Sequence, residues 1–145
     1  MEKGAGGPGE RAAPELKIKA ELSQMDRIRA FLSQSLGGLR LPDVEYNQIE
    51  LALHEVCINI IRYGFPGRNG EIYLKITAEE GVVKIEIRDS GIPFDPSHAG
   101  EPDLEAKIRR GDRGGYGIFL SRQLMDEFDY RREDGENVLR LSKRI

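Results

Sequence analysis

The sequence is poor in the features that mark secreted, membrane-spanning and nucleic-acid-binding proteins. It holds a single cysteine, Cys57, so an internal disulfide is excluded. No apolar stretch approaches the roughly 20 residues that span a bilayer, and residues 1–15 are too polar and glycine-rich for a signal peptide. The 22 lysine and arginine residues are outnumbered by 25 acidic ones, and no basic stripe with interleaved aromatics appears. These absences predict a cytoplasmic protein that binds neither membrane nor nucleic acid directly.

The size and composition predict one folded domain. A chain of 145 residues, 39% hydrophobic and 32% charged, is large enough for one proper core but not for two. Residues 1–14 are rich in glycine, proline and alanine and have nothing to bury. We therefore expect a disordered tail followed by a single domain at residues 15–145. Cys57 lies in an apolar helical segment and is expected to be a small core residue.

Hydrophobic periodicity predicts the order strand, two helices, hairpin, lid, helix and hairpin. The first half comprises a strand at 15–22, a helix at 24–36 capped by Ser23, a helix at 43–63 ended by Gly64, and paired strands at 71–78 and 82–88. The second half comprises a lid at about 93–114 with a short helix at 103–110, a helix at 116–127, and strands at 128–132 and 138–143 around Asp134-Gly135. This order predicts an α+β fold, a two-layer sandwich with helices on one face of a mostly antiparallel mixed sheet.

Two polar side chains interrupt a helix that is otherwise apolar on most of its circumference. In ELALHEVCINIIRYG, residues 50–64, Glu55 and Asn59 stand four residues apart and therefore share one face. A carboxylate in apolar surroundings is costly unless it has a partner, so the pair suggests a site. In the alternative interpretation, Glu55 pairs with Arg62 and both belong to the edge of the solvent-exposed face.

Two glycine motifs follow the hairpin. In DSGIPFD, residues 89–95, Asp89 can accept a hydrogen bond from an exocyclic amine, and Gly91 permits a sharp turn and close approach of a flat ligand. Taken alone, this motif is also that of an ordinary turn. In GDRGGYGIFLSRQLMDEF, residues 111–128, glycines precede a helix whose free N–H groups and positive dipole end favour phosphate. This motif lacks the Gly-Lys-Ser/Thr ending of a P-loop and is weak by itself.

In this order, E-x-x-x-N on a helix, D-x-G after a hairpin and G-G-x-G before a helix resemble the motifs of the Bergerat-fold ATPases. Within that superfamily, the chain most resembles the bacterial anti-sigma factor serine kinases, over residues 15–145. The segments that carry this resemblance are VVKIEIRDSGIPFDP, GGYGIFLSRQLMDEFDY and ENVLRLSK. The resemblance implies the Bergerat ATP-binding fold and the cofactors ATP and Mg²⁺.

The resemblance also implies roles at the matching positions. Glu55 would be the general base, Asn59 a ligand of Mg²⁺, and Asp89 the reader of the adenine amino group, with Gly91 giving clearance. Arg113 would meet the γ-phosphate, unless it is only a solvated charge of the lid. The backbone of Gly115, Tyr116 and Gly117 would bind phosphates, with Ile118 and Phe119 packed behind it. The further residues expected at the nucleotide are Arg62, Ile92, Pro93 and Gly114.

The sequence departs from the family's pattern at two places. Many members carry a His-Gly or His-Ala pair soon after the asparagine, where this chain has Tyr63-Gly64. A threonine in the closing strands often supports the adenine, and here the nearby residues are Asn137, Val138 and Ser142. Neither departure removes a ligand to metal or phosphate, but both bear on nucleotide affinity.

The function implied is that of an ATP-dependent protein serine kinase that phosphorylates an anti-anti-sigma partner and sequesters a sigma factor. The family also implies a homodimer formed through residues 15–36, where Arg27 and Arg29 would either meet the sigma factor or remain solvated. Two alternatives stay open. One is an ATP-gated protein-binding module without phosphotransfer, and the other is a stand-alone histidine kinase-type ATPase domain.

Overall fold

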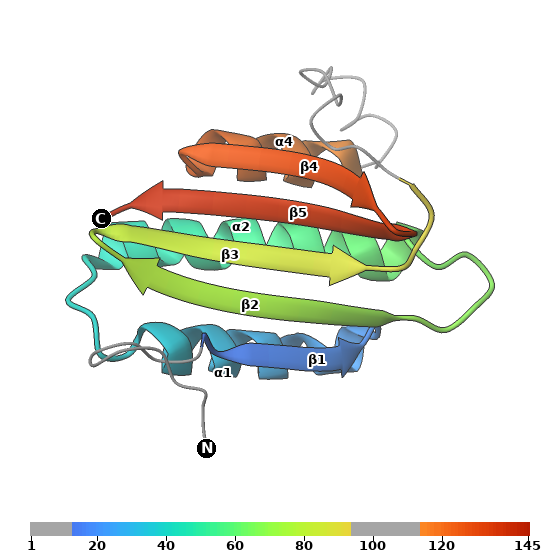
Figure 1. Ribbon diagram of the computed structural model, residues 1–145, viewed down its shortest axis with the longest axis horizontal. Coiled ribbons are helices and arrows are strands. Elements are labelled where there is room, and N and C mark those ends of the chain that lie inside the picture. The colour runs from blue at the N-terminus through green and yellow to red at the C-terminus, as the bar shows by residue number, and fades with distance from the viewer. Residues whose placement is uncertain (1–12, 94–113) are drawn as a thin grey trace.

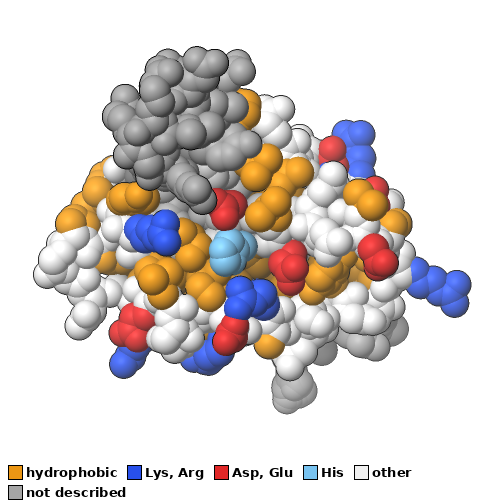
Figure 2. Space-filling view, turned by 180° about the vertical axis from the view of Figure 1, so that it is seen from behind, with side chains coloured by type: hydrophobic (Ala, Val, Ile, Leu, Met, Phe, Trp, Pro, Cys, Tyr) orange, Lys and Arg blue, Asp and Glu red, His pale blue; other side chains and the backbone are white. Residues whose placement is uncertain are grey.

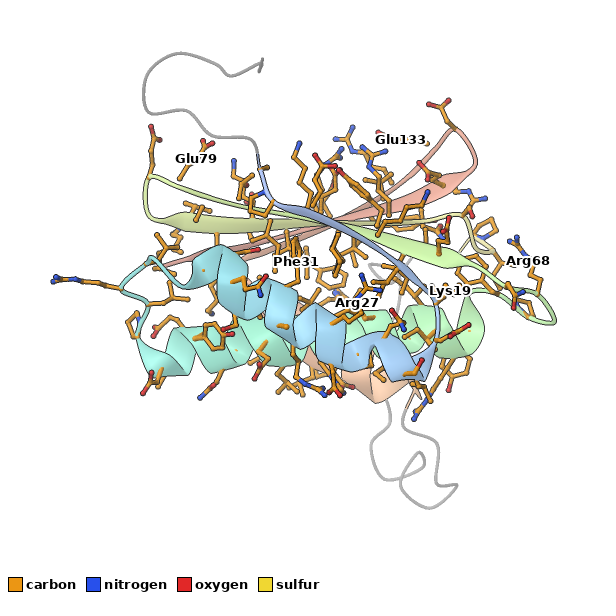
Figure 3. All side chains as sticks on the ribbon, turned by 90° about the horizontal axis from the view of Figure 1, so that it is seen from below. Lys19, Arg27, Phe31, Arg68, Glu79 and Glu133 are labelled. Atoms are coloured by element: carbon orange, nitrogen blue, oxygen red, sulfur yellow. The ribbon has the colours of Figure 1, made fainter. Side chains whose placement is uncertain are left out.

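The computed structural model describes residues 13–93 and 114–145, which form a five-stranded sheet covered on one face by helices (Figure 1). The elements are β1 (Glu15–Lys19), η1 (Leu22–Gln24), α1 (Met25–Leu36), α2 (Asp43–Tyr63), β2 (Glu71–Glu79), β3 (Val82–Asp89), α4 (Gly114–Leu124), β4 (Glu127–Glu133) and β5 (Glu136–Arg144). The strand order is β1-β2-β3-β5-β4, and Figure 3 shows the helix layer and the sheet layer from the edge. The predicted two-layer α+β sandwich is confirmed, although the described sheet is antiparallel throughout rather than mixed.

The predicted first strand is too long, and its predicted cap is wrong. β1 ends at Lys19, after which the Ala20 N–H donates to the Gly70 carbonyl at 2.8 Å and the chain leaves the sheet. The 3₁₀ turn η1 then leads into α1. Ser23 lies inside this turn, and the N-cap of α1 is Gln24, which makes no side-chain capping hydrogen bond.

The helix predicted at residues 116–127 begins and ends earlier in the structure. α4 starts at Gly114 and stops at Leu124, because the Asp126 N–H already donates to the Ser142 carbonyl of β5 at 2.9 Å. Residues 125–127, which apolar periodicity alone assigns to the helix, therefore lie outside α4, and β4 already begins at Glu127. The predicted tail up to residue 12, the short helix at 103–110 and the lid between residues 94 and 113 lie outside the described residues.

Two tight hairpin turns fix the register of the sheet. Glu80 and Gly81 join β2 to β3, and both have positive φ, at 51° and 77°. Asp134 and Gly135 join β4 to β5 in the same way, with φ of 50° and 80°. Positive φ at both central residues is the geometry of the two-residue turn that matches the twist of the flanking strands. Both predicted hairpins are thereby confirmed.

α2 is the longest described helix and carries the predicted Glu55–Asn59 pair. It ends as predicted, where the Gly64 N–H donates to the Ile60 carbonyl at 2.8 Å. None of the helices in the described part of the chain has the length and apolar character that crossing a bilayer requires. α2 instead packs against α1 on one side and α4 on the other, beneath the sheet.

The core lies between the two layers. Its fully buried side chains include Ile28, Leu32, Ile49, Leu53 and Val56 from the helices and Leu74, Ile76, Ile85, Ile87 and Leu141 from the sheet. Cys57 is also fully buried, as predicted. Burial raises the pKa of its thiol to about 12, and the negative charge of Asp89 adds to the effect. The thiol therefore stays protonated and unreactive in the folded protein.

The molecular surface mixes both signs of charge. On the helix side, Figure 2 shows acidic and basic side chains interspersed with hydrophobic ones. On the open face of the sheet, acids and bases alternate across the strands in one row, which consists of Glu15, Lys75, Glu86, Arg140 and Asp129. Opposite charges on directly paired strands stabilise a sheet, so this row supports the observed register.

Glu86, at the centre of this row, is expected to make stability depend on pH. Desolvation raises its pKa, but the hydrogen bonds from Arg88 (2.8 Å) and Arg140 (3.0 Å) outweigh that effect, and the pKa lies below the ordinary value. A lowered pKa contributes stability above the unfolded-state pKa, near 4.3, that is lost as pH falls through the folded-state pKa. Glu86→Gln should therefore cost about 0.5–1 kcal/mol at pH 7 and much less near pH 3.

Denaturant unfolding of wild type and variant at the two pH values measures this difference. Glu79→Gln is the matched control, because the exposed Glu79 of the neighbouring strand makes no ion pair or hydrogen bond to any described side chain. A destabilisation of equal size at both pH values would show that charge on Glu86 is not its cause.

Candidate active site

One pocket brings together Asn59 and Asp89, two of the polar residues singled out in the sequence. It lies between α2 and the strands β3, β5 and β4, at the end of the sheet where β3 ends. Its lining residues are Val56, Asn59, Ile60, Tyr63, Gly64, Asp89, Ile92, Tyr130, Asn137 and Leu139. Most of these side chains are apolar, with a few polar groups among them, which is the usual character of a small-molecule site.

Asp89 is the buried acceptor of this pocket. It is the last residue of β3 and is only 5% exposed. Its Oδ1 accepts hydrogen bonds from the Gly91 N–H (2.8 Å) and from Asn137 Nδ2 (3.0 Å). Burial raises the pKa of the carboxyl, and these two hydrogen bonds oppose the rise. Within the described part of the chain Oδ2 accepts no hydrogen bond, so one oxygen remains for a ligand.

Gly91 is a glycine for a reason that the sequence did not reveal. A Cβ at this position would collide with the Gly64 carbonyl and lie 2.8 Å from Asp89 Oδ1. The next residue, Ile92, donates its N–H to the same Gly64 carbonyl at 2.9 Å. Close packing of the chain against the end of α2 therefore already requires glycine, before any ligand is considered. Ile92 lines the pocket while remaining 44% exposed, and Pro93 is exposed.

Asn59 lines the pocket, whereas Glu55, one turn earlier on α2, faces the start of α4. A Cβ at Gly117 would fall on Glu55 Oε1, so the carboxylate lies directly against the backbone of α4. The alternative pairing of Glu55 with Arg62 does not occur in the described structure. Arg62 is exposed and is not a pocket residue, whereas His54 Nε2 lies 4.0 Å from Glu55 Oε2.

α4 presents its first turn to this carboxylate. Residues 114–117 form that turn, and the first four N–H groups of a helix have no partner within the helix. Ser121 fixes α4 against α2, because its buried hydroxyl lies 2.9 Å from the Gly117 carbonyl and 3.3 Å from the Ala52 carbonyl. Phe119 is half-buried, whereas Arg113 and the side chains of Tyr116 and Ile118 lie outside the described residues.

Two residues at this site had no place in the sequence argument. Tyr130 lines the pocket and donates its hydroxyl hydrogen to Asn137 Oδ1 at 2.6 Å. Arg132 donates to the same oxygen at 3.1 Å. Tyr130 and Arg132 stand two residues apart on β4, so they share one face, and Arg132 lies directly opposite Asn137. The predicted closing hairpin could have indicated this arrangement. Their side chains looked like those of an ordinary exposed strand edge.

The whole fold is matched by one family of proteins. The family model for the histidine kinase-like ATPase domain matches residues 18–143. The chain belongs to this family. Among curated proteins, this histidine kinase-like ATPase domain is 33% identical over 95 residues to the serine/threonine-protein kinase BtrW of Bordetella bronchiseptica, covering 65% of this chain and 67% of BtrW. It is 25% identical over 129 residues to the serine-protein kinase RsbW of Bacillus cereus, covering 86% and 81% of the two chains.

A solved structure shares the fold of this histidine kinase-like ATPase domain. The crystal structure of the RsbU and RsbW domains of Rv1364c from Mycobacterium tuberculosis superposes with a TM-score of 0.58 at 19% sequence identity. The match covers 93% of this chain and 34% of that longer one. The arrangement of sheet and helices is therefore that of a solved structure, in agreement with the predicted fold.

The described residues of this site suit a metal ion that is held by a nucleotide as well as by the protein. Among the described residues, no three His, Cys, Asp or Glu side chains are close enough together to hold a metal ion. The pocket offers the amide oxygen of Asn59. Mg²⁺ is commonly held by one or two protein oxygens together with substrate phosphates and waters. The donor set thus fits a nucleotide-bound Mg²⁺ and does not fit a metal site built from protein alone.

Replacing Asp89 tests whether the pocket reads an amine. In Asp89→Asn, an amide that also carries donors replaces the acceptor-only carboxylate, and we expect ADP binding to weaken by about 1–3 kcal/mol. The folded variant should be at least as stable as wild type near pH 7, because burial raises the pKa of Asp89 and a buried carboxylate costs stability above that pKa. Calorimetric titration with ADP and thermal unfolding measure the two effects. Unchanged ADP affinity would contradict the assignment.

Proposed function

We propose that this protein is an ATP-dependent protein serine kinase. The observation that carries the proposal is the juxtaposition of Glu55 with the first turn of α4, one helical turn from Asn59 and beside the Asp89 pocket. A protein that only binds nucleotide needs the pocket and the free N–H groups. A carboxylate beside the first turn of α4 is the additional element that a phosphotransferase needs. The kinase names of the relatives BtrW and RsbW support the same interpretation.

Each group then has a role in phosphoryl transfer, which depends mainly on positioning and charge neutralisation. Asp89 accepts a hydrogen bond from the adenine amino group, and the N–H groups of residues 114–117 bind the phosphates. Asn59 would hold Mg²⁺, which neutralises phosphate charge when it is bound. Glu55 accepts the proton of the attacking serine hydroxyl. Arg113 is proposed to meet the γ-phosphate from the lid.

The proposed protein partners are an anti-anti-sigma protein as phosphorylation substrate and a sigma factor that is sequestered. A homodimer through β1 and α1 is part of this proposal, since β1 is an edge strand of the described sheet. Arg27 and Arg29 are exposed on α1, where they contact Gln24 and Asp26 on their own helix end. Those local contacts leave both guanidinium groups on the surface, where a partner can compete for them.

Incubation with labelled ATP, Mg²⁺ and candidate anti-anti-sigma proteins tests the proposal directly. Transfer of label to a serine of the partner is the expected result. Tight ATP binding with no transfer to any partner would instead favour the ATP-gated binding module. Label appearing on histidine would favour a histidine kinase-type domain.

A further inference from the structure

The chain segment that follows Asp89 is held at three successive carbonyl groups by side chains from three different elements. Arg68 Nη2 donates to the Ser90 carbonyl at 2.8 Å, from the loop after α2 (Figure 3). Arg132 Nη1 donates to the Gly91 carbonyl at 2.8 Å, from β4. Asn137 Nδ2 donates to the Ile92 carbonyl at 2.9 Å, from β5. The position of the segment after Asp89, which borders the pocket, therefore depends on Arg68, Arg132 and Asn137, which lie outside the D-x-G motif.

Asn137 is the centre of this arrangement, and its side-chain amide is saturated. The amide has two N–H donors and an oxygen that accepts two hydrogen bonds. The nitrogen donates to Asp89 Oδ1 at 3.0 Å and to the Ile92 carbonyl at 2.9 Å. The oxygen accepts from the Tyr130 hydroxyl at 2.6 Å and from Arg132 Nη1 at 3.1 Å. No donor or acceptor of Asn137 is left for a ligand.

The partners also fix which way the amide points. A guanidinium can only donate and a carboxylate can only accept, so the oxygen must face Arg132 and the nitrogen must face Asp89. Asn137 is paired directly with Asp89 across β5 and β3 and with Arg132 across β5 and β4. Antiparallel partners point to the same side of a sheet, so the strand register holds all three groups on the helix-facing side.

We propose that Tyr130, Arg132 and Asn137 form a brace that makes the pocket selective for 6-amino purines over 6-oxo purines. This inference rests on the proposed nucleotide-dependent function, and it names the residues that set the base preference of the pocket. With Asn137 saturated, Asp89 Oδ2 is the oxygen of this hydrogen-bonded group that is left for the base, and an acceptor pairs with an amine and repels a carbonyl oxygen. Removing Tyr130 or Arg132 takes away one of the two hydrogen bonds that hold the amide oxygen of Asn137. The amide is then held less firmly and can more readily turn an N–H toward a 6-oxo group.

Direct titration with two nucleotides measures this preference without any protein substrate. ADP and inosine diphosphate differ at position 6 of the base, where one has an amine and the other an oxo group. In Tyr130→Phe, we expect ADP affinity to fall about two- to tenfold, the effect of one lost hydrogen bond, while inosine diphosphate affinity holds or rises. Arg132→Gln should narrow the preference further, because Arg132 contacts both Asn137 and the Gly91 carbonyl.

Two further variants provide the controls. Arg131→Gln removes an arginine from the same strand, but Arg131 is exposed and pairs with Asp129 (3.3 Å), so the preference should stay at the wild-type value. Arg132→Lys keeps a cation that can donate, and it should recover part of the preference lost in Arg132→Gln. In a phosphotransfer assay, the brace variants should raise the KM for ATP and leave kcat unchanged, since Glu55 and Asn59 are untouched.

The outcomes separate this inference from the proposed function. If Tyr130→Phe and Arg132→Gln lower the melting temperature but keep the wild-type preference for ADP, the brace is only structural and the inference is wrong, while the kinase proposal stands. If the wild-type protein binds neither nucleotide, both are overturned. A narrowed preference in both variants, with Arg131→Gln unchanged, supports the inference.

Discussion

Phosphorylation of the partner by Glu55→Gln should be slower than by wild type by a factor of about 10²–10⁴, the contribution of a positioned general base. Glutamine keeps the size of the side chain and its packing against Gly117, but it cannot take the proton of the attacking hydroxyl. The affinity for ATP should stay close to wild type, because the base does not hold the nucleotide. Single-turnover transfer rates, measured alongside ATP titrations, separate the two quantities.

Two results would contradict this assignment. Wild-type transfer rates in Glu55→Gln would mean that the carboxylate is structural. A loss of ATP affinity equal to the loss of rate would mean that Glu55 contributes to binding rather than to proton transfer. His54→Gln is a suitable companion variant, because it removes the imidazole that lies 4.0 Å from Glu55 and leaves the proposed base in place.

Gly117→Ala is expected to have an effect nearly as large by a steric route. The added methyl group would occupy the position of Glu55 Oε1, so the carboxylate must move away from the first turn of α4. Alanine favours the helix by about 0.5–1 kcal/mol, whereas overpacking costs about 1–3 kcal/mol. These opposing effects should keep the change in unfolding free energy below about 2.5 kcal/mol, while the transfer rate falls toward that of Glu55→Gln.

A double variant makes this test sharper. If Gly117→Ala acts by displacing Glu55, combining it with Glu55→Gln should cost little more rate than Glu55→Gln alone, because the two changes remove the same interaction. Fully additive losses would show that Gly117 acts independently of Glu55. Gly38→Ala is the neutral control, since a Cβ at that position meets nothing within 4 Å.

Most of the fold was predictable because local patterns determine it. The apolar periodicity of the segment 43–63 and the glycine that follows it determine the length of α2. Glu80-Gly81 and Asp134-Gly135 take up positive φ and set both hairpins. The errors occurred where tertiary pairing decides. β1 stops early because Ala20 bonds to Gly70, and α4 stops early because the sheet begins to pair at Asp126.

The candidate site was predictable only where local sequence patterns mark its residues. Asn59 and Asp89 were visible as polar residues within apolar patterns, and both line one pocket. The brace residues Tyr130 and Arg132 were not visible, because on an edge strand a tyrosine and an arginine at alternate positions are unremarkable in sequence. Only the pairing of β4 with β5 brings them onto Asn137. The reason for Gly91 was hidden likewise, since it depends on the distant carbonyl of Gly64.

The buried Cys57 gives this protein a natural reporter of its own opening. It is the only thiol in the chain, it is fully buried on α2, and its raised pKa makes the folded state inert to alkylating reagents. The rate at which an alkylating reagent labels Cys57 therefore reports the fraction of molecules in which unfolding exposes this thiol. A nucleotide that binds only the folded state lowers that population by the factor 1 + [L]/Kd, so the labelling rate measures ligand affinity without a fluorophore or an engineered cysteine.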